Sequence, residues 1–201
     1  MNIFFDYGNT LIHFDPEEIV KSFGVAGEDG KTLAQIIFSR KYFDRLDEGS
    51  LSQEDFCKAV GEEVPGRLFG IAQLICNNWQ YHLPVIEGMP ELLGECKARG
   101  HKLYVLSNIS ENFADSFENI WIFRYFDGFI FSGKIKLVKP SYEIFRYALE
   151  KFGLKPEETA FIDDSPVNVE AARHCGIRSL LFDKDPEKAR KFLAETLGNK
   201  A

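Results

Sequence analysis

The chain has 201 residues, of which 45% are hydrophobic and 27% charged, and its formal net charge at pH 7 is −7. This length and composition suit one globular domain with a core of its own and a smaller second lobe. The acidic balance argues against a nucleic-acid or anionic-membrane surface and favours a cytoplasmic protein that acts on small molecules. The apolar runs are too short to span a membrane, so we expect no membrane partner.

Five short apolar runs predict the strands of a buried sheet. They are Ile3–Phe5, Leu103–Leu106, Phe129–Phe131, Ala160–Ile162 and Ser179–Phe182. Continuous apolar runs are typical of parallel strands, which are covered on both faces. Four helical patterns alternate with the later strands, and a glycine directly follows each of them: Pro90–Arg99, Ser141–Phe152, Pro166–Cys175 and Pro186–Leu197. This alternation predicts an α/β fold with a doubly wound, parallel, Rossmann-like sheet.

The segment from residue 15 to residue 83 contains no convincing strand and is predicted to be all-helical. Its apolar residues recur at helical spacing, most clearly at Leu68, Ile71, Ala72, Ile75 and Trp79. An insertion after the first strand lies above the carboxyl edge of the sheet, where α/β folds bind ligands. We therefore expect an α/β core domain formed by residues 1–14 and 84–201, and a helical cap domain formed by residues 15–83.

The four cysteines are widely spaced and form no CxxC pair; they are Cys57, Cys76, Cys96 and Cys175. None has the neighbours that a zinc site requires. We expect reduced thiols, buried as small hydrophobic side chains, in a reducing compartment.

Polar residues follow four of the predicted strands. In chain order they are Asp6, the pair Ser107 and Asn108, Lys139 before Pro140, and the pair Asp163 and Asp164. Each feature is common by itself, because a Ser-Asn pair is usually a turn, Lys-Pro often starts a helix, and acids often cap one. In this order and on this fold, however, they form a set that suits one kind of chemistry.

The set suits phosphoryl transfer. The carboxylate of Asp6 could attack phosphorus and form an aspartyl-phosphate. Two anions would then meet, so positive charge is needed nearby. A magnesium ion bound by Asp164, with Asp163 beside it, would provide that charge, and Lys139 would add a fixed one. The hydroxyl of Ser107 and adjacent backbone N–H groups could hold the phosphate oxygens.

The four motifs resemble those of the haloacid dehalogenase (HAD) superfamily of aspartate-dependent hydrolases. The stretches that carry the resemblance are FFDYGNTL, VLSN, the Lys-Pro of LVKPSYEIF, and FIDDSPVNVEAA, and they extend over nearly the whole chain. The helical insertion resembles the C1-type cap of that family.

The resemblance assigns a role to each motif residue. It implies that Asp6 is the nucleophile and that Lys139 assists it. It implies that the metal ligands are the Asp6 and Asp164 side chains and the backbone carbonyl of Gly8, with Asp163 as a further ligand or as a neighbour that supports them. The phosphate-binding residues that it implies are Ser107, Asn108 and Lys139.

Position 8 departs from the family pattern. Most phosphatases of the family carry a second aspartate there, which protonates the leaving group and then deprotonates the attacking water, whereas this chain has Gly8. General acid–base catalysis is typically worth about 10²–10⁴-fold in rate. The chain should therefore hydrolyse aryl phosphates better than alkyl phosphates, unless water, the substrate or His13 supplies the proton.

A glycine at this position also occurs in the glucose-1-phosphate phosphatase-like subgroup, whose first motif reads Asp-Leu-Gly-Asn-Val. The cap segment LDEGSLSQEDF, the pair Trp79 and Gln80, and the segment HKLYVLSN resemble that subgroup as well. We therefore expect a Mg²⁺-dependent phosphatase of small phosphorylated metabolites, with sugar phosphates as candidates.

Two alternatives stay open. A catalytically weak HAD-like binding or regulatory protein would also lack the second aspartate. A metal-free 2-haloacid dehalogenase is disfavoured by the adjacent Asp163 and Asp164, because close carboxylates repel each other without a cation.

Three further features could be structural or functional, and we expect a structural role for each. A cluster on one cap helix is expected to be a solvated face rather than a ligand site; its members are Arg40, Lys41, Tyr42 and Arg45. Trp79 is expected in the cap core. The Phe-rich run from Phe113 to Phe131 is expected to form core and connecting surface, and we expect a monomer or a weak homodimer.

Overall fold

A five-stranded parallel sheet forms the centre of the computed structural model, which describes residues 1–198, with side chains described to residue 196. The strands are β1 Asn2–Phe5, β2 Lys102–Ser107, β3 Gly128–Phe131, β4 Thr159–Asp163 and β5 Arg178–Leu181. Their order across the sheet is β3-β2-β1-β4-β5, and every pairing is parallel. The predicted fold class is confirmed. Phe182, predicted in the last strand, follows it instead, and its ring is buried.

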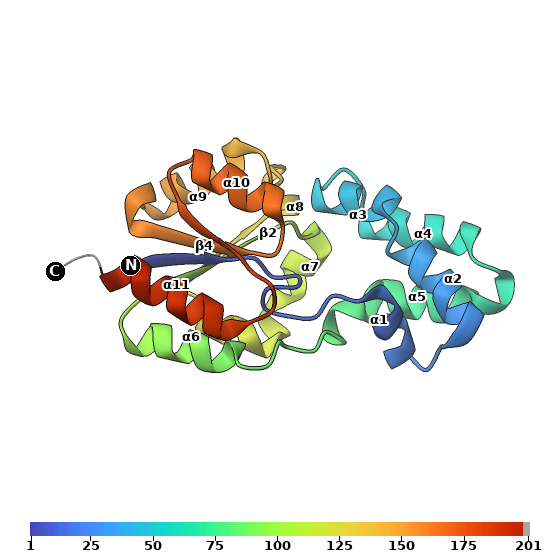
Figure 1. The fold of residues 1–201 in the computed structure, drawn as a ribbon. Helices are drawn as coiled ribbons and strands as arrows, with labels where there is room; N and C mark the ends of the chain where they lie inside the picture. Colours follow the sequence, from blue (N-terminus) through green and yellow to red (C-terminus); the bar gives the residue numbers. More distant parts are fainter. Residues whose placement is uncertain (199–201) are drawn as a thin grey trace.

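Helices cover both faces of the sheet (Figure 1). The helices of this part of the chain are α6 Met89–Ala98, α7 Glu111–Ser116, α8 Ser132–Ile135, α9 Tyr142–Phe152, α10 Pro166–His174 and α11 Pro186–Gly198. Alternate strand residues point to opposite faces. Ile3 and Phe5 therefore pack with α6 and α11, whereas Phe4 packs with α9 and α10.

The four predicted core helices are present, and none of their ends differs from the prediction by more than one residue. The short helices α7 and α8 were not predicted. Gly100, Gly153 and Gly176 follow three of the helices with positive φ, between +63° and +81°. This left-handed conformation ends a helix at little cost in glycine alone, which is why the glycines marked the helix ends in the sequence.

The segment between β1 and α6 is helical, as expected. Its helices are α1 Pro16–Ser22, α2 Gly27–Ile37, α3 Arg40–Asp47, α4 Gln53–Glu63 and α5 Phe69–Asn78, with 3₁₀ turns η1 Gly66–Leu68 and η2 Trp79–Tyr81. They enclose a hydrophobic cluster separate from those on the sheet, and they form a lobe beyond the carboxyl edge (Figure 1). We propose residues 15–83 as the cap domain on this basis.

The register brings the predicted motif residues to one edge of the sheet. Phe5 is the partner of both Val105 and Ile162, so the residues that follow these positions lie side by side. The backbone N–H of Asp6 donates to the carbonyl of Ile162 at 2.9 Å, which extends the pairing by one residue. This edge faces the cap (Figure 1).

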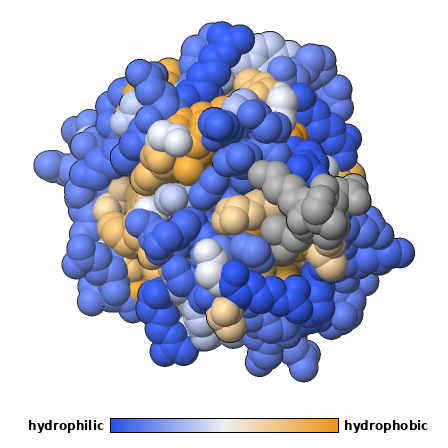
Figure 2. Space-filling view, turned by 90° about the vertical axis from the view of Figure 1, so that its left-hand side faces the viewer, coloured by the Kyte–Doolittle hydropathy of each residue, from blue (hydrophilic) through white to orange (hydrophobic). Residues whose placement is uncertain are grey.

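The opposite end of the molecule, seen in Figure 2, is largely hydrophilic with smaller hydrophobic areas. None of the helices within residues 1–198 is long and apolar enough to cross a membrane. The cysteines are free: Cys57, Cys76 and Cys96 are buried, as expected, and Cys175 is half-buried.

Candidate active site

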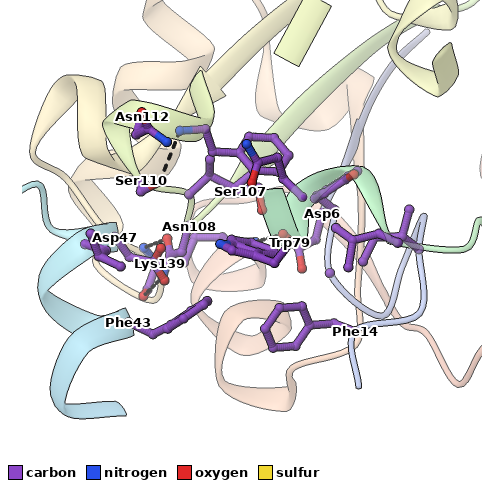
Figure 3. A pocket seen from close by; sticks show the side chains of 18 of the residues that line it. Asp6, Phe14, Phe43, Asp47, Trp79, Ser107, Asn108, Ser110, Asn112 and Lys139 are labelled. Atoms are coloured by element: carbon purple, nitrogen blue, oxygen red, sulfur yellow. Dashed lines mark hydrogen bonds and ion pairs between the residues drawn. The ribbon is translucent and has the colours of Figure 1, made fainter. Parts of the chain in front are cut away.

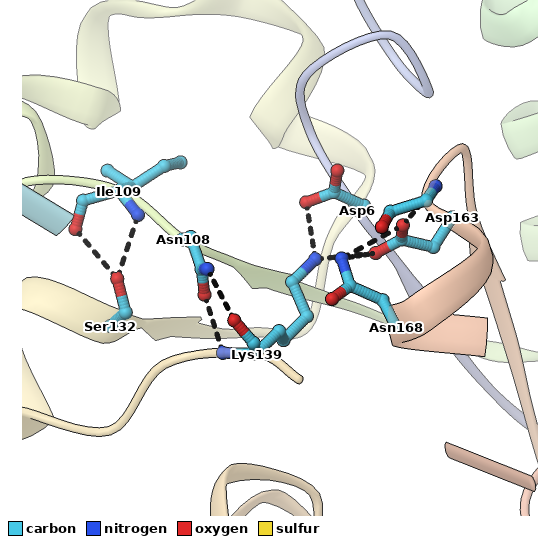
Figure 4. A network of polar contacts seen from close by, with 8 residues as sticks. Asp6, Asn108, Ile109, Ser132, Lys139, Asp163 and Asn168 are labelled. Atoms are coloured by element: carbon cyan, nitrogen blue, oxygen red, sulfur yellow. Dashed lines mark hydrogen bonds and ion pairs between the residues drawn. The ribbon is translucent and has the colours of Figure 1, made fainter. Parts of the chain in front are cut away.

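A buried ion-pair network joins the carboxyl ends of β1 and β4. The Nζ atom of Lys139 donates to Oδ1 of Asp6 at 2.7 Å and to Oδ2 of Asp163 at 2.6 Å (Figure 4). The Lys139 side chain is only 1% exposed, and those of Asp6 and Asp163 are 11% and 0% exposed. Buried charges are tolerated when they are paired and hydrogen-bonded, so each group of this network depends on the others.

Lys139 keeps its positive charge in this buried place. Burial by itself would lower its pKa, but the adjacent carboxylates of Asp163 and Asp6 outweigh that effect and raise the pKa of Lys139 above its ordinary value. The lysine is therefore a fixed positive charge in contact with the carboxylate of Asp6.

Asp163 is held by donors from the start of α10. Its Oδ1 accepts a hydrogen bond from the backbone N–H of Ser165 at 2.7 Å, and Nδ2 of Asn168 lies 3.1 Å from both carboxylate oxygens (Figure 4). Because both oxygens are engaged with protein donors, Asp163 is better suited to orienting Lys139 than to binding a metal directly. Asn168 was not predicted; its position in the first turn after the Asp-Asp pair is the signal that could have found it.

Asp6 and Asp164, with Asp163 beside them, could hold a divalent cation. One carboxylate oxygen from each of Asp6, Asp163 and Asp164 lies within 4.8 Å of the others. Burial, together with the charges of Asp6 and Asp163, raises the pKa of Asp164 to about 6. Lys139 offsets only part of the negative charge, so a bound cation would relieve the remaining repulsion. An oxygen-only donor set is the kind that Mg²⁺ prefers.

The residues after β2 hold the lysine segment in place. Ser107 is the last residue of β2 and is buried. The Asn108 side chain accepts from the backbone N–H of Lys139 at 2.8 Å and donates to the Lys139 carbonyl at 2.9 Å (Figure 4). Both polar atoms of the Asn108 amide are therefore engaged with the Lys139 backbone. Contact between phosphate and this residue remains a prediction, for which the backbone N–H is the available donor.

A cavity of about 190 Å³ adjoins these residues and receives side chains from core and cap alike (Figure 3). Asp6, Ser107 and Lys139 line it from the core. Aromatic rings form much of the remaining wall. The rings of Phe14, Phe43 and Trp79 contact one another, with centroids 5.5 to 5.8 Å apart.

Gly8 also lines this cavity, and a lack of space for a side chain is not the reason for a glycine at this position. A Cβ atom built on Gly8 would meet no atom within 4 Å, and Gly8 does not have positive φ. The backbone could therefore carry an aspartate here. The missing acid is a property of this sequence and is not imposed by crowding.

Comparison with known proteins decides the family. A family model described as haloacid dehalogenase-like hydrolase matches residues 1–176. The chain belongs to this family. The predicted superfamily is thus confirmed, whereas the predicted subgroup stays a prediction.

Several relatives of this hydrolase match over most of its length. A D-ribitol-5-phosphate phosphatase from Bacteroides thetaiotaomicron is 26% identical over 89% of this chain and 89% of its own length. A sesquiterpene phosphatase from Aspergillus oryzae is 32% identical over 88% of this chain and 86% of its own length. The fold matches a HAD family enzyme from B. thetaiotaomicron, solved with magnesium and inorganic phosphate, with a TM-score of 0.66 at 24% identity. That match covers 89% of this chain and 92% of the other.

The candidate ligands outside the four motifs lie elsewhere in this hydrolase. His13 is exposed and lines a different hollow. Lys41 and Tyr42 both contact Glu63, and Tyr42 is buried. Arg40 is exposed and lies 3.4 Å from Asp44. The solvated face expected here is found at Arg40, Lys41 and Arg45, which are exposed, but the expectation is wrong for Tyr42, whose ring packs inside the cap cluster.

Helix α3 instead presents a different face to the cavity, formed by Phe43, Leu46 and Asp47. Their spacing of three and four residues places them on one side of a helix, and this was the signal that sequence reasoning missed. Trp79 was expected in the cap core. Its partly buried ring packs against the cap cluster and also against a cluster on the sheet, and it lines the cavity.

Proposed function

We propose that this HAD-like hydrolase is a Mg²⁺-dependent phosphatase of small phosphorylated metabolites and that Asp6 forms an aspartyl-phosphate. The observation that carries the proposal is the buried Lys139 between Asp6 and Asp163, with Asp164 close enough to share a cation with Asp6. Positive charge around a carboxylate is what its attack on an anionic phosphate ester requires.

Each residue of the network has a proposed part in the reaction. A carboxylate oxygen of Asp6 attacks phosphorus while Lys139 offsets the charge that gathers there. Asp163 and Asn108 position the lysine through the hydrogen bonds described above. The hydroxyl of Ser107 and the backbone N–H groups beside it bind the non-bridging oxygens, which keeps the phosphoryl group in line for attack.

The metal would be held by the side chains of Asp6 and Asp164 and by the backbone carbonyl of Gly8. When bound, Mg²⁺ supplies positive charge to the phosphoryl oxygens and to the attacking carboxylate. Asp163 lies next to this set, but its oxygens are already occupied by protein donors.

The cavity lining bears on the substrate. Relatives act on a sugar-alcohol phosphate and on a sesquiterpene phosphate, according to their names. In this chain the rings of Phe14, Phe43 and Trp79 line the cavity, and hydroxyl groups buried against carbon would lose hydrogen bonds to water. We therefore favour phosphate monoesters whose leaving group has an apolar face, such as aryl or short prenyl alcohols, over fully hydroxylated sugars.

One experiment separates this function from the two alternatives. A panel of phosphate monoesters is assayed with Mg²⁺ and with a chelator. We expect hydrolysis that chelation stops and added Mg²⁺ restores. Undiminished hydrolysis in chelator, or metal-free release of halide from 2-haloacids, would contradict the proposal. Binding of phosphate esters without any turnover would identify a binding protein instead.

A further inference from the structure

Gly8 leaves the proposed reaction without a proton donor in its usual place, so another group must protonate an alkoxide leaving group. His13 is exposed and lines another hollow. Among the described residues that line the cavity, Asp6 and Asp47 are the only carboxylates. Because Asp6 is assigned as the nucleophile, Asp47 is the acid available on the cap side.

We infer that Asp47, the last residue of α3, is the general acid and base of this hydrolase and replaces the aspartate that position 8 lacks. The inference rests on the proposed phosphatase function. It adds a catalytic residue from the cap, and the cap would then take part in the chemistry as well as in substrate selection.

The cap segment that carries Asp47 is fastened to the core. The Ser132 hydroxyl, at the start of α8, donates to the backbone carbonyl of Asp47 at 2.6 Å, and the same hydroxyl accepts from the backbone N–H of Ile109 at 2.9 Å. Figure 4 shows the contact of Ser132 with Ile109, next to Asn108. One hydroxyl thus ties Asp47 to the loop that is proposed to bind phosphate.

A second contact holds the same segment. Nζ of Lys136 donates to the carbonyl of Gly49 at 2.9 Å. Gly49 has a φ of +66°, and a Cβ atom there would lie 2.6 Å from the carbonyl oxygen of Gly133. The cap backbone at Gly49 therefore lies so close to Gly133 of the core that only a glycine fits. Because the anchors engage backbone carbonyls, the carboxyl group of Asp47 is left for the cavity (Figure 3).

The surroundings of Asp47 favour a protonated carboxyl group. Burial, together with the charges of Asp44, Asp6 and Glu48, raises the pKa of Asp47 to about 7, against the opposite effect of Lys139. A group that is partly protonated at neutral pH can donate in one step and accept in the next.

The proposed steps balance in atoms and charge. An oxygen of Asp6 bonds to phosphorus, the bond from phosphorus to the leaving oxygen breaks, and the carboxyl proton of Asp47 passes to that oxygen, so the alcohol leaves neutral. The Asp47 carboxylate then takes one proton from water. The water oxygen bonds to phosphorus as the bond to Asp6 breaks, which releases hydrogen phosphate and restores both aspartates.

The test compares leaving groups that differ in their need for a proton. Full-length wild-type and Asp47→Asn proteins are assayed in Mg²⁺ with 4-nitrophenyl phosphate and with phenethyl phosphate. Glu48→Gln is the matched control, because Glu48 is the exposed neighbouring acid. We expect Asp47→Asn to lower kcat/KM for phenethyl phosphate by about 10²-fold, and kcat/KM for the nitrophenyl ester by less than about threefold. This ratio reports the steps up to cleavage of the ester, before Asp47 would act as a base on water. Adding Gly8→Asp to Asp47→Asn should recover turnover of phenethyl phosphate.

The outcomes separate this inference from the proposed function. Equal losses of kcat/KM with both esters, or no loss of kcat/KM with phenethyl phosphate, would overturn the role of Asp47 while leaving the phosphatase intact. If the wild-type protein hydrolysed the nitrophenyl ester but not the phenethyl ester, the role of Asp47 would be overturned as well. No turnover of either ester would overturn the phosphatase assignment and this inference together. Thermal unfolding of both variants checks that the fold is unchanged, since Asp47→Asn retains the backbone bond to Ser132.

Discussion

At the scale of single residues, the site depends on the buried positive charge of one lysine. Lys139 contacts two carboxylates, and removing the lysine would leave both negative charges buried without their positive partner. The neighbouring lysines on the surface have no such role; Lys134, for example, is 40% exposed and pairs with Asp115. The two lysines therefore form a matched pair for mutation.

Lys139→Ala is expected to lower kcat/KM by at least about tenfold, or roughly 1.4 kcal/mol, because a fixed charge disappears from a site that excludes water. Lys134→Ala should leave kcat/KM within about twofold of the wild type. Steady-state kinetics with 4-nitrophenyl phosphate measure both values. A smaller loss for Lys139→Ala, or an equal loss for both variants, would assign Lys139 to structure.

At the scale of elements, the core could be predicted because each element carries its own local signal. The apolar run of β4 ends at Asp163 and Asp164, and glycines follow the helices. Helices α7 and α8 were missed because six and four residues are too few to establish a helical period. The cap contribution of Asp47 was missed for another reason. It depends on how α3 docks on α8, and that contact joins residues 85 positions apart.

The docking of α3 on α8 can be tested at Gly49. Gly49→Ala would force a side chain into left-handed backbone and against the carbonyl of Gly133, which should lower the free energy of unfolding by about 1–3 kcal/mol. Gly24 has a similar positive φ, +85°, but open space around it, so Gly24→Ala isolates the cost of the backbone conformation. Urea unfolding measures both. Equal destabilisation would mean that the close approach of cap and core contributes nothing.

At the scale of the whole molecule, metal and protons should compete for the site. The pKa of Asp164, raised to about 6, means that the metal-free folded protein binds a proton more readily than the unfolded chain does. The free energy of unfolding that this group contributes therefore falls as pH rises from about 4 to about 6. Mg²⁺ binds the deprotonated carboxylates, so it should reverse this loss.

The rise in Tm on adding Mg²⁺ should accordingly be larger near pH 8 than near about pH 5. Thermal unfolding with and without the ion, at both pH values, provides the comparison. Ca²⁺ at the same concentration is a useful control for the preference of the site. A shift in Tm that is the same at both pH values would argue that Mg²⁺ binds away from these acids.

Asp6 is proposed to carry the phosphoryl group during turnover. The most direct test of this role is to quench the Mg²⁺-loaded enzyme during turnover of 4-nitrophenyl phosphate, reduce it with borohydride, and map its peptides by mass spectrometry. An aspartyl-phosphate is reduced to the alcohol, so we predict that residue 6 alone is converted, and that Asp6→Asn shows neither conversion nor turnover. Turnover with Asp6 unmodified, or conversion at another carboxylate, would contradict it.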